Sequence, residues 1–198
     1  MELTDVLRRR RMVRNFTDDD VTEAAIDRIL AAGRRAPSAG NTDGTELLLL
    51  QGDAVARYWD TTLPAPRRER FRWPGLLRAP VLVVPCTRAT AYVERYAEAD
   101  KARPGLGDSI DEWPVPYWHI DTGMAVMAML LAVVDEGLGA LFFGIFEHED
   151  AVRAAFAIPE THQPIGTIAI GHPAPDEPGR SAGRPRRDPA AVIHRGHW

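Results

Sequence analysis

The stretch IDTGMAVMAMLLAVVDE, residues 120–136, decides how the rest of the chain can be arranged. Its residues are nearly all apolar over a length that predicts a helix, and Gly137 is well placed to end that helix. A helix that is apolar all round must be buried on most of its faces. In a chain of 198 residues we therefore expect it either at the centre of the fold or in a dimer interface.

Helical and strand patterns alternate irregularly on both sides of this helix. Further helices are predicted from Thr4 to the arginine run, from Thr22 to Gly33 and from Asp150 to Phe156. Short apolar runs predict strands at residues 46–51, 79–87, 140–144 and 165–171. Residues 59–78 and 103–118 carry several prolines and little periodicity, which favours irregular surface connections. This order of elements predicts an α+β protein with three layers and no internal repeats.

We expect residues 1–198 to form one domain. Within it, the segment around residues 88–118 has the composition of a lid or binding loop, and it contains Trp113, Tyr117 and Trp118. The C-terminal tail, residues 173–198, is rich in proline, glycine and arginine. Such a tail is expected to run extended across another surface rather than to form a core of its own.

Composition and charge exclude several classes of partner. The net charge of −4 gives no global attraction to nucleic acid or to an anionic membrane, so we expect neither. The single cysteine, Cys86, excludes an intramolecular disulfide, and the histidines show no metal-type spacing, so no metal site is expected. The N-terminus does not read as a signal peptide, and no apolar stretch reaches the roughly 20 residues that span a bilayer. We therefore expect a cytoplasmic protein.

Two short stretches indicate an anion and a flat ring as ligands. Arg10, Arg11 and Arg14 precede the predicted helix that begins at Thr22, and the sequence APSAGN follows that helix at residues 36–41. Forked guanidinium groups beside free backbone N–H groups are the donors that a phosphate monoester requires. The glycines of residues 137–144 follow a helix and lead into a strand, the wrong order for a nucleotide phosphate loop. They favour instead a close backbone approach at Gly144, which can serve a flat ring.

The sequence offers no recognisable set of acid, base, nucleophile or metal ligand, so any redox reaction would be carried by a cofactor. The stretches RRMVRNF at 10–16, APSAGN at 36–41, GLG at 137–139 and the segment from Arg187 to His194 carry a resemblance. Through them the chain resembles the nitroreductase family of FMN-dependent oxidoreductases. The resemblance implies a homodimer with a three-layer α-β-α fold around a central mixed, mainly antiparallel sheet.

The same resemblance implies which residues would bind FMN. Its phosphate would be held by Arg10, Arg11 and Arg14, joined from the tail by Arg187 and by Arg184 or Arg186. The ring would be contacted from the partner subunit by Pro37, Ser38, Ala39, Gly40 and Asn41. The backbone at Phe143 and Gly144 would approach the reactive flavin nitrogen. Met12 stands where the family often has serine, and the lost hydrogen bond, worth about 1 kcal/mol, is small beside the charge-assisted bonds that remain.

By resemblance the activity is the transfer of electrons from NADH or NADPH through FMN to a small planar acceptor, a nitroaromatic or a quinone, by a ping-pong mechanism. Trp113, Tyr117 and Trp118 either stack on that acceptor or pack the loop onto the body of the protein. Asp43, if it points toward the ring, would disfavour a negatively charged reduced flavin. Two alternatives stay open: a deazaflavin-linked or biosynthetic flavin dehydrogenase, and a non-catalytic dimer that sequesters flavin.

Overall fold

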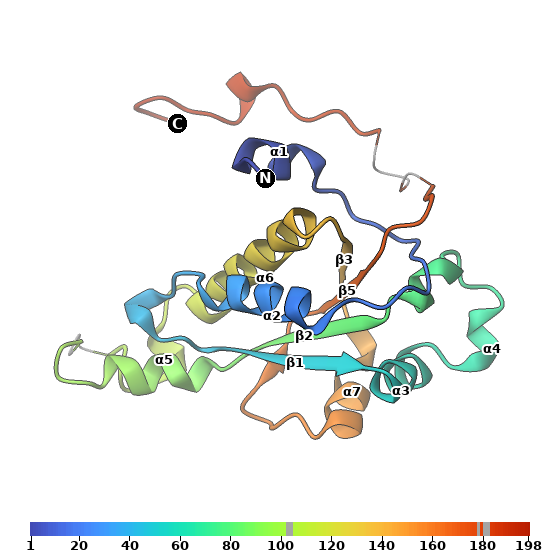
Figure 1. Ribbon diagram of the computed structural model, residues 1–198. Coiled ribbons are helices and arrows are strands. Elements are labelled where there is room, and N and C mark those ends of the chain that lie inside the picture. Colours follow the sequence, from blue (N-terminus) through green and yellow to red (C-terminus); the bar gives the residue numbers. More distant parts are fainter. Residues whose placement is uncertain (102–104, 178, 180–182) are drawn as a thin grey trace.

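A sheet between two helical layers forms the body of the protein, as the computed structural model in Figure 1 shows for residues 1–101, 105–177, 179 and 183–198. The strands are β1 (Thr45–Gln51), β2 (Val81–Thr87), β5 (Thr167–Gly171) and β3 (Gly139–Phe143), in that order across the sheet, and β4 (Gln163–Pro164) also pairs with β2. These pairs are antiparallel, and one isolated parallel bridge joins Met12 to Ala140. The three-layer α+β fold with a mainly antiparallel sheet is therefore confirmed.

The central strand β2 shows how the two layers arise. Successive side chains of a strand point to opposite faces of the sheet. Val81 and Val83 belong to the core beneath α2 (Glu23–Arg34) and α6 (Tyr117–Asp135), whereas Leu82 and Val84 belong to the core beneath α3 (Asp53–Thr62) and α7 (Glu149–Phe156). Every residue of β2 is buried, as expected for a strand that is covered on both faces.

Helix α2 packs tightly on α6. Its first turn is capped by Thr22, whose side-chain oxygen accepts a 3.3 Å hydrogen bond from Ala25 N–H. At Gly33 a β-carbon would stand 2.7 Å from Met129 Cγ, so a side chain there would collide with α6. Gly33 is therefore required by the close approach of the two helices, in addition to lying near the end of α2.

Helix α6 begins at Tyr117, three residues before the predicted start, and only one of its faces is buried. That face carries Asp121, Thr122, Ala125, Val126, Met129, Leu130 and Val133. The opposite face is apolar and exposed at Tyr117, Ile120, Met124 and Met127. By length and composition, α6 is the one helix in the described part of the chain that could cross a membrane. Its buried face instead contacts α2 and strands β1, β2 and β3.

The connections are more regular than the sequence predicts. The prediction that residues 59–78 are irregular is wrong. Helix α3 continues to Thr62, α4 spans Ala65–Arg68, and a 3₁₀ turn covers Pro74–Arg78. Within the segment around 88–118 the structure has α5 (Ala89–Tyr96), a 3₁₀ turn at Ile110–Glu112 and the start of α6. Burial of Tyr58, Trp59 and Thr62 on one side of α3, and of Ala91 and Tyr92 on α5, explains these helices. Residues 102–104 of that segment lie outside the described residues.

Both ends of the chain lie on the same side of the body. Helix α1 (Leu3–Arg9) packs against α6, and the tail runs past α1 with a short 3₁₀ turn at Pro189–Ala191 (Figure 1). Its residues from 183 onward are exposed, and residues 178 and 180–182 lie outside the description. An extended tail that crosses another surface stays a prediction.

The buried hydroxyl of Tyr58 leads to a prediction about alkaline stability. A 2.7 Å hydrogen bond joins it to Thr167 Oγ1, and burial raises the pKa of Tyr58 from 10.0 to about 12. Because the folded pKa lies above the unfolded one, this stabilisation is complete below pH 10 and is lost as the pH rises toward 12. Between pH 9 and pH 11 the free energy of unfolding should decrease in the wild type. In Tyr58→Phe, which has no hydroxyl to ionise, this decrease should be smaller by about 1 kcal/mol. Urea unfolding at both pH values measures the free energy of unfolding. An equal decrease between the two pH values in both proteins would contradict the prediction.

Candidate functional site

The N-terminal segment carries Arg14 to the edge of the sheet. Helix α1 ends at Arg9, the N–H of the next residue, Arg10, donates to Val6 O, and the chain then runs beside β3. Val13 N–H donates to Ala140 O at 2.9 Å, and Met12 forms the parallel bridge with the same residue. Met12 itself is half-buried and packs against both hydrophobic cores. Its side chain is therefore part of the packing that holds this segment in place.

Arg14 is fixed from both ends of the chain. Its backbone N–H donates to Asp176 Oδ2 at 2.7 Å, and its Nη1 donates to Met12 O at 3.2 Å. The guanidinium carbon lies 5.4 Å from the centre of the Trp73 ring, which is the geometry of a cation–π contact. A β-carbon on Gly179 would lie 3.0 Å from Arg14 Nη1, so the tail passes directly beside the guanidinium group.

A cavity of about 410 Å³ opens next to Arg14. Its walls are largely aromatic and include Tyr58, Trp59, Phe71, Trp73, Phe143 and Phe146, together with Gly144. The rings of Trp59 and Phe143 stack nearly parallel, 5.9 Å apart and 8° from coplanar. Aromatic walls with a few polar groups and a volume between about 300 and 1,000 Å³ are typical of small-molecule sites.

The donors of this cavity suit a flat ring with an anionic group, and so they fit FMN. Arg14 supplies the positive charge, and Gly144 has no side chain to hold a ring away from its backbone. The buried Nε1 of Trp59 has no hydrogen-bond partner among the described residues. An unpaired buried donor is unfavourable, but this atom has almost no accessible surface, so it is not a donor that a ligand in the cavity reaches in this structure.

Phe146 is the unusual residue of the cavity. Its side chain is 82% exposed, and its backbone φ is 48°, in the left-handed region that bulky residues rarely adopt. The ring lies over Gly144, where an added β-carbon would be 2.6 Å from Phe146 Cζ. Exposure of a large apolar ring on a strained backbone is a feature of binding sites, because a ligand or partner can compensate both costs.

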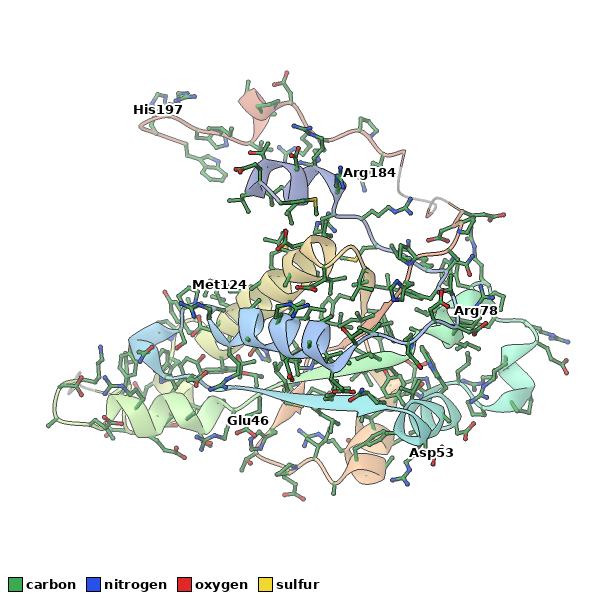
Figure 2. The ribbon with its side chains drawn as sticks, viewed as in Figure 1. Glu46, Asp53, Arg78, Met124, Arg184 and His197 are labelled. Carbon is green, nitrogen blue, oxygen red and sulfur yellow. The ribbon has the colours of Figure 1, made fainter. Side chains whose placement is uncertain are left out.

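The other arginines do not reach this cavity in one subunit. Arg10 and Arg11 line a second hollow of about 320 Å³, together with Pro173 and residues of the Gly137–Ala140 turn. Arg184, Arg186 and Arg187 are exposed, and none of them is among the described residues that line the cavity at Arg14. Arg187 Nη2 donates to Ala191 O at 2.8 Å, and Figure 2 shows Arg184 on the tail near α1. The arginines proposed to hold the phosphate therefore lie in three places within one subunit: the cavity at Arg14, the hollow at Arg10 and Arg11, and the exposed tail.

Residues Pro37 to Asn41 lie at the far end of the body, close to α5 and the start of α6 (Figure 1). Ala39–Asn41 forms a 3₁₀ turn, and Ser38 Oγ accepts a 3.0 Å hydrogen bond from Asp43 N–H. Asn41 and Asp43 have φ angles of 57° and 52°, in the left-handed region that asparagine and aspartate tolerate better than other residues with side chains. Asp43 is exposed, and the structure does not bring this loop to the cavity at Arg14 within one subunit.

Sequence reasoning missed the residues that hold this loop. Asp121 Oδ2 accepts hydrogen bonds from Ala39 N–H at 2.8 Å and from Tyr92 O–H at 2.7 Å. Burial, and then the neighbouring carboxylate of Asp121, raise the pKa of Tyr92 well above its ordinary range, so its hydroxyl remains a donor. The available signal was Asp121 itself, a carboxylate near the start of an otherwise apolar helix.

The aromatic residues of the predicted lid are divided between packing and exposure. Trp113 is buried, donates from Nε1 to Leu106 O at 2.9 Å, and meets the ring of Tyr96 edge-on at 4.8 Å between centroids. Trp118 is half-buried in the same cluster, and its backbone oxygen accepts from Thr87 and Thr122 hydroxyls. Tyr117 lies on the exposed face of α6. Trp113 therefore packs the loop onto the body of the protein. Tyr117 is exposed and could contact a ligand or another subunit.

Fold and site together define a three-layer α+β protein with an aromatic, arginine-containing cavity for a flat anionic ligand. A model of the nitroreductase family matches residues 7–172, and the chain belongs to that family. The predicted resemblance is confirmed.

Named relatives support the same family. A protein of Methanothermobacter thermautotrophicus, provisionally named NADH dehydrogenase/NAD(P)H nitroreductase, is 26% identical over all of this chain and 88% of its own length. The FMN reductase (NAD(P)H) of Bacillus subtilis is 24% identical over 93% of this chain and 69% of its own. A provisionally named nitroreductase from Desulfovibrio desulfuricans, solved in complex with FMN, is 25% identical, with a TM-score of 0.69 over 100% of this chain and 98% of its own.

Proposed function

We propose that the protein is a cytoplasmic, homodimeric, FMN-dependent NAD(P)H oxidoreductase that reduces a small planar acceptor. The observation that carries the proposal is the cavity in which Arg14, Phe143 and Gly144 meet between aromatic walls. Membership of the nitroreductase family and the names of the relatives, which include an FMN reductase (NAD(P)H), support the cofactor and the electron donor. A nitroaromatic or quinone is the proposed acceptor, because a flat apolar molecule suits aromatic walls.

The residues of this chain would bind and orient the cofactor. Arg14, with Arg10, Arg11 and the arginines of the tail, supplies guanidinium donors for the phosphate. Gly144 has no side chain of its own, so a ring could lie closely on its backbone once the Phe146 ring, which now lies over Gly144, moves aside. The aromatic walls exclude water and so strengthen the electrostatic interactions inside the cavity. FMN, when bound, would supply the two-electron chemistry that no side chain of the cavity provides.

A two-fold dimer would complete the site. In Figure 1 the loop at residues 37–41 lies beside α5, whereas α3, which lines the cavity at Arg14, lies at the opposite end of the body. This loop can therefore cover such a cavity only from a second subunit. The exposed apolar face of α6 is the surface that we propose for the dimer contact. A two-fold axis pairs this face with the same face of the second subunit. The same symmetry would bring the loop of each subunit to the cavity of the other.

The experiment that tests this function is an absorption spectrum of the purified protein, loaded with FMN, before and after addition of NADH or NADPH. Bleaching of the flavin band by either nucleotide, followed by recovery with a quinone or nitroaromatic, is expected. Initial rates should give parallel lines, because one cavity serves donor and acceptor in turn. Intersecting lines would overturn the ping-pong mechanism.

The same measurements separate the alternatives. Stoichiometric FMN that NAD(P)H does not reduce would favour the dimer that sequesters flavin. Reduction by a reduced deazaflavin alone would favour the deazaflavin-linked enzyme. A protein that cannot be loaded with FMN would overturn the proposed function altogether.

A further inference from the structure

Asp121 is a buried carboxylate in an apolar setting. It is 3% exposed on α6, and its Oδ2 accepts from two neutral donors, the N–H of Ala39 and the O–H of Tyr92. Among the described residues it forms no ion pair. Burying a charge without a cation is unfavourable, and an apolar residue would suit the interior of α6 better. Stability of the helix therefore does not account for Asp121.

What Asp121 holds is the loop that includes residues 38–41. Gly40 has a φ of 67° and Asn41 a φ of 57°, so the backbone turns here through the left-handed region, which glycine and asparagine adopt more readily than other residues. Asp121 fixes this turn at Ala39, and Arg95 Nε fixes it one residue later by donating to Gly40 O at 2.9 Å. The ring of Tyr96 closes the remaining side, since a β-carbon on Gly40 would lie 2.8 Å from it.

These contacts hold the loop in its turn without a ligand. A flat ring that is covered by a preorganised loop is bound without the cost of ordering that loop. Tyr92 has a second role, because its hydroxyl supplies the other hydrogen bond that the buried carboxylate needs. Asp121, Tyr92 and Arg95 together connect the loop to two helices of its own subunit, α6 and α5.

We infer that Asp121 is a positioning residue: through the Ala39 N–H it holds the loop of its own subunit in the shape that covers the flavin bound at Arg14 of the partner subunit. The inference rests on the proposed function, because it requires an FMN site shared by two subunits. It adds a residue that touches neither the ring nor its phosphate. Its effect is on the geometry of Ala39 to Asn41.

Three variants test the inference through FMN affinity, measured by quenching of flavin fluorescence. Asp121→Ala removes the acceptor, and we expect the FMN dissociation constant to rise at least about tenfold. Asp121→Asn keeps a carbonyl oxygen in the same place and is expected to stay within about threefold of the wild type. Val126→Ala is the matched control, since Val126 is buried on the same face of α6 and belongs to the core cluster of α2 and α6. It should lower the thermal midpoint without changing the FMN dissociation constant.

Unchanged affinity in Asp121→Ala would overturn the inference. So would an equal loss in Val126→Ala at a similar thermal midpoint, because general destabilisation would then explain the effect. An equal loss in Asp121→Asn would also overturn the inference, because the charge of the carboxylate rather than the position of its acceptor oxygen would then control FMN affinity.

A mixed dimer tests whether Asp121 acts on the neighbouring site. When Arg14→Ala and Asp121→Ala subunits are combined, one site carries both changes and the other carries neither. In the purified mixed dimer, FMN occupancy should reach about half of the wild-type value per chain, whereas each variant alone binds poorly. No recovery in mixed dimers would overturn action across the interface. Absence of FMN binding in the wild type would instead overturn the proposed function, and this inference with it.

Discussion

Arg14→Ala is expected to weaken FMN binding by about 10- to 100-fold, because a hydrogen bond to a charged group contributes about 1.5–3 kcal/mol and each 1.4 kcal/mol is tenfold in affinity. Arg14 is the arginine that the structure places in the same cavity as Phe143 and Gly144. Its position is set by Asp176 and Trp73 before any ligand is present. The fluorescence of free FMN during a titration measures the dissociation constant.

Riboflavin, which lacks the phosphate, makes the test specific. The wild type should prefer FMN to riboflavin, and Arg14→Ala should lose most of that preference. Arg8→Ala is the charge-matched control, since Arg8 lies on α1 with its side chain 73% exposed and paired to Asp5. A surface pair of this kind contributes little, so Arg8→Ala should bind FMN as the wild type does. Wild-type affinity in Arg14→Ala would contradict the assignment of Arg14 to the phosphate.

The double substitution Met124→Glu and Met127→Glu is expected to convert the dimer to monomers and to remove most bound FMN. Both side chains lie on the outer face of α6, 36% and 39% exposed in the isolated subunit. Buried without a partner charge, each carboxylate would cost several kcal/mol in a dimer interface. In a monomer the same carboxylates would remain in water, so the fold itself should be retained.

Sedimentation and circular dichroism distinguish these effects. The variant should sediment at half the wild-type mass, with an unchanged far-ultraviolet spectrum and little flavin. Ala154→Glu on α7 introduces a charge at another exposed helical position and should leave the mass and the flavin content unchanged. A dimer that persists in the double variant would mean that another surface joins the subunits.

The helix at residues 120–136 shows how far a pattern can be taken. Its apolar residues predicted both the helix and its burial against other parts of the protein, and the structure places it against α2 and the sheet. The pattern could not divide the helix into faces, because it is apolar nearly all round. Packing against α2 selects which face is buried, and the close contact at Gly33 and Met129 determines that choice.

The connections were harder to predict for a related reason. Prolines and arginines in residues 59–78 conceal the helical spacing of Tyr58, Trp59 and Thr62, whose burial supports α3 only after the sheet has formed. The same tertiary burial supports α5 at Tyr92. In both helices, packing against the body outweighs weak local propensity.

By itself, the sequence determined the strands, the main helices and the family, because these depend on periodicity and on short motifs that act over a few neighbouring residues. Only the tertiary structure decided that Arg14 shares a cavity with Phe143 and Trp73 while Arg10 and Arg11 face a different hollow. It also decided that Asp121 meets Ala39, 82 residues away along the chain. Such contacts depend on the order of the strands and on how the helices pack across them, and no local pattern in the chain encodes either.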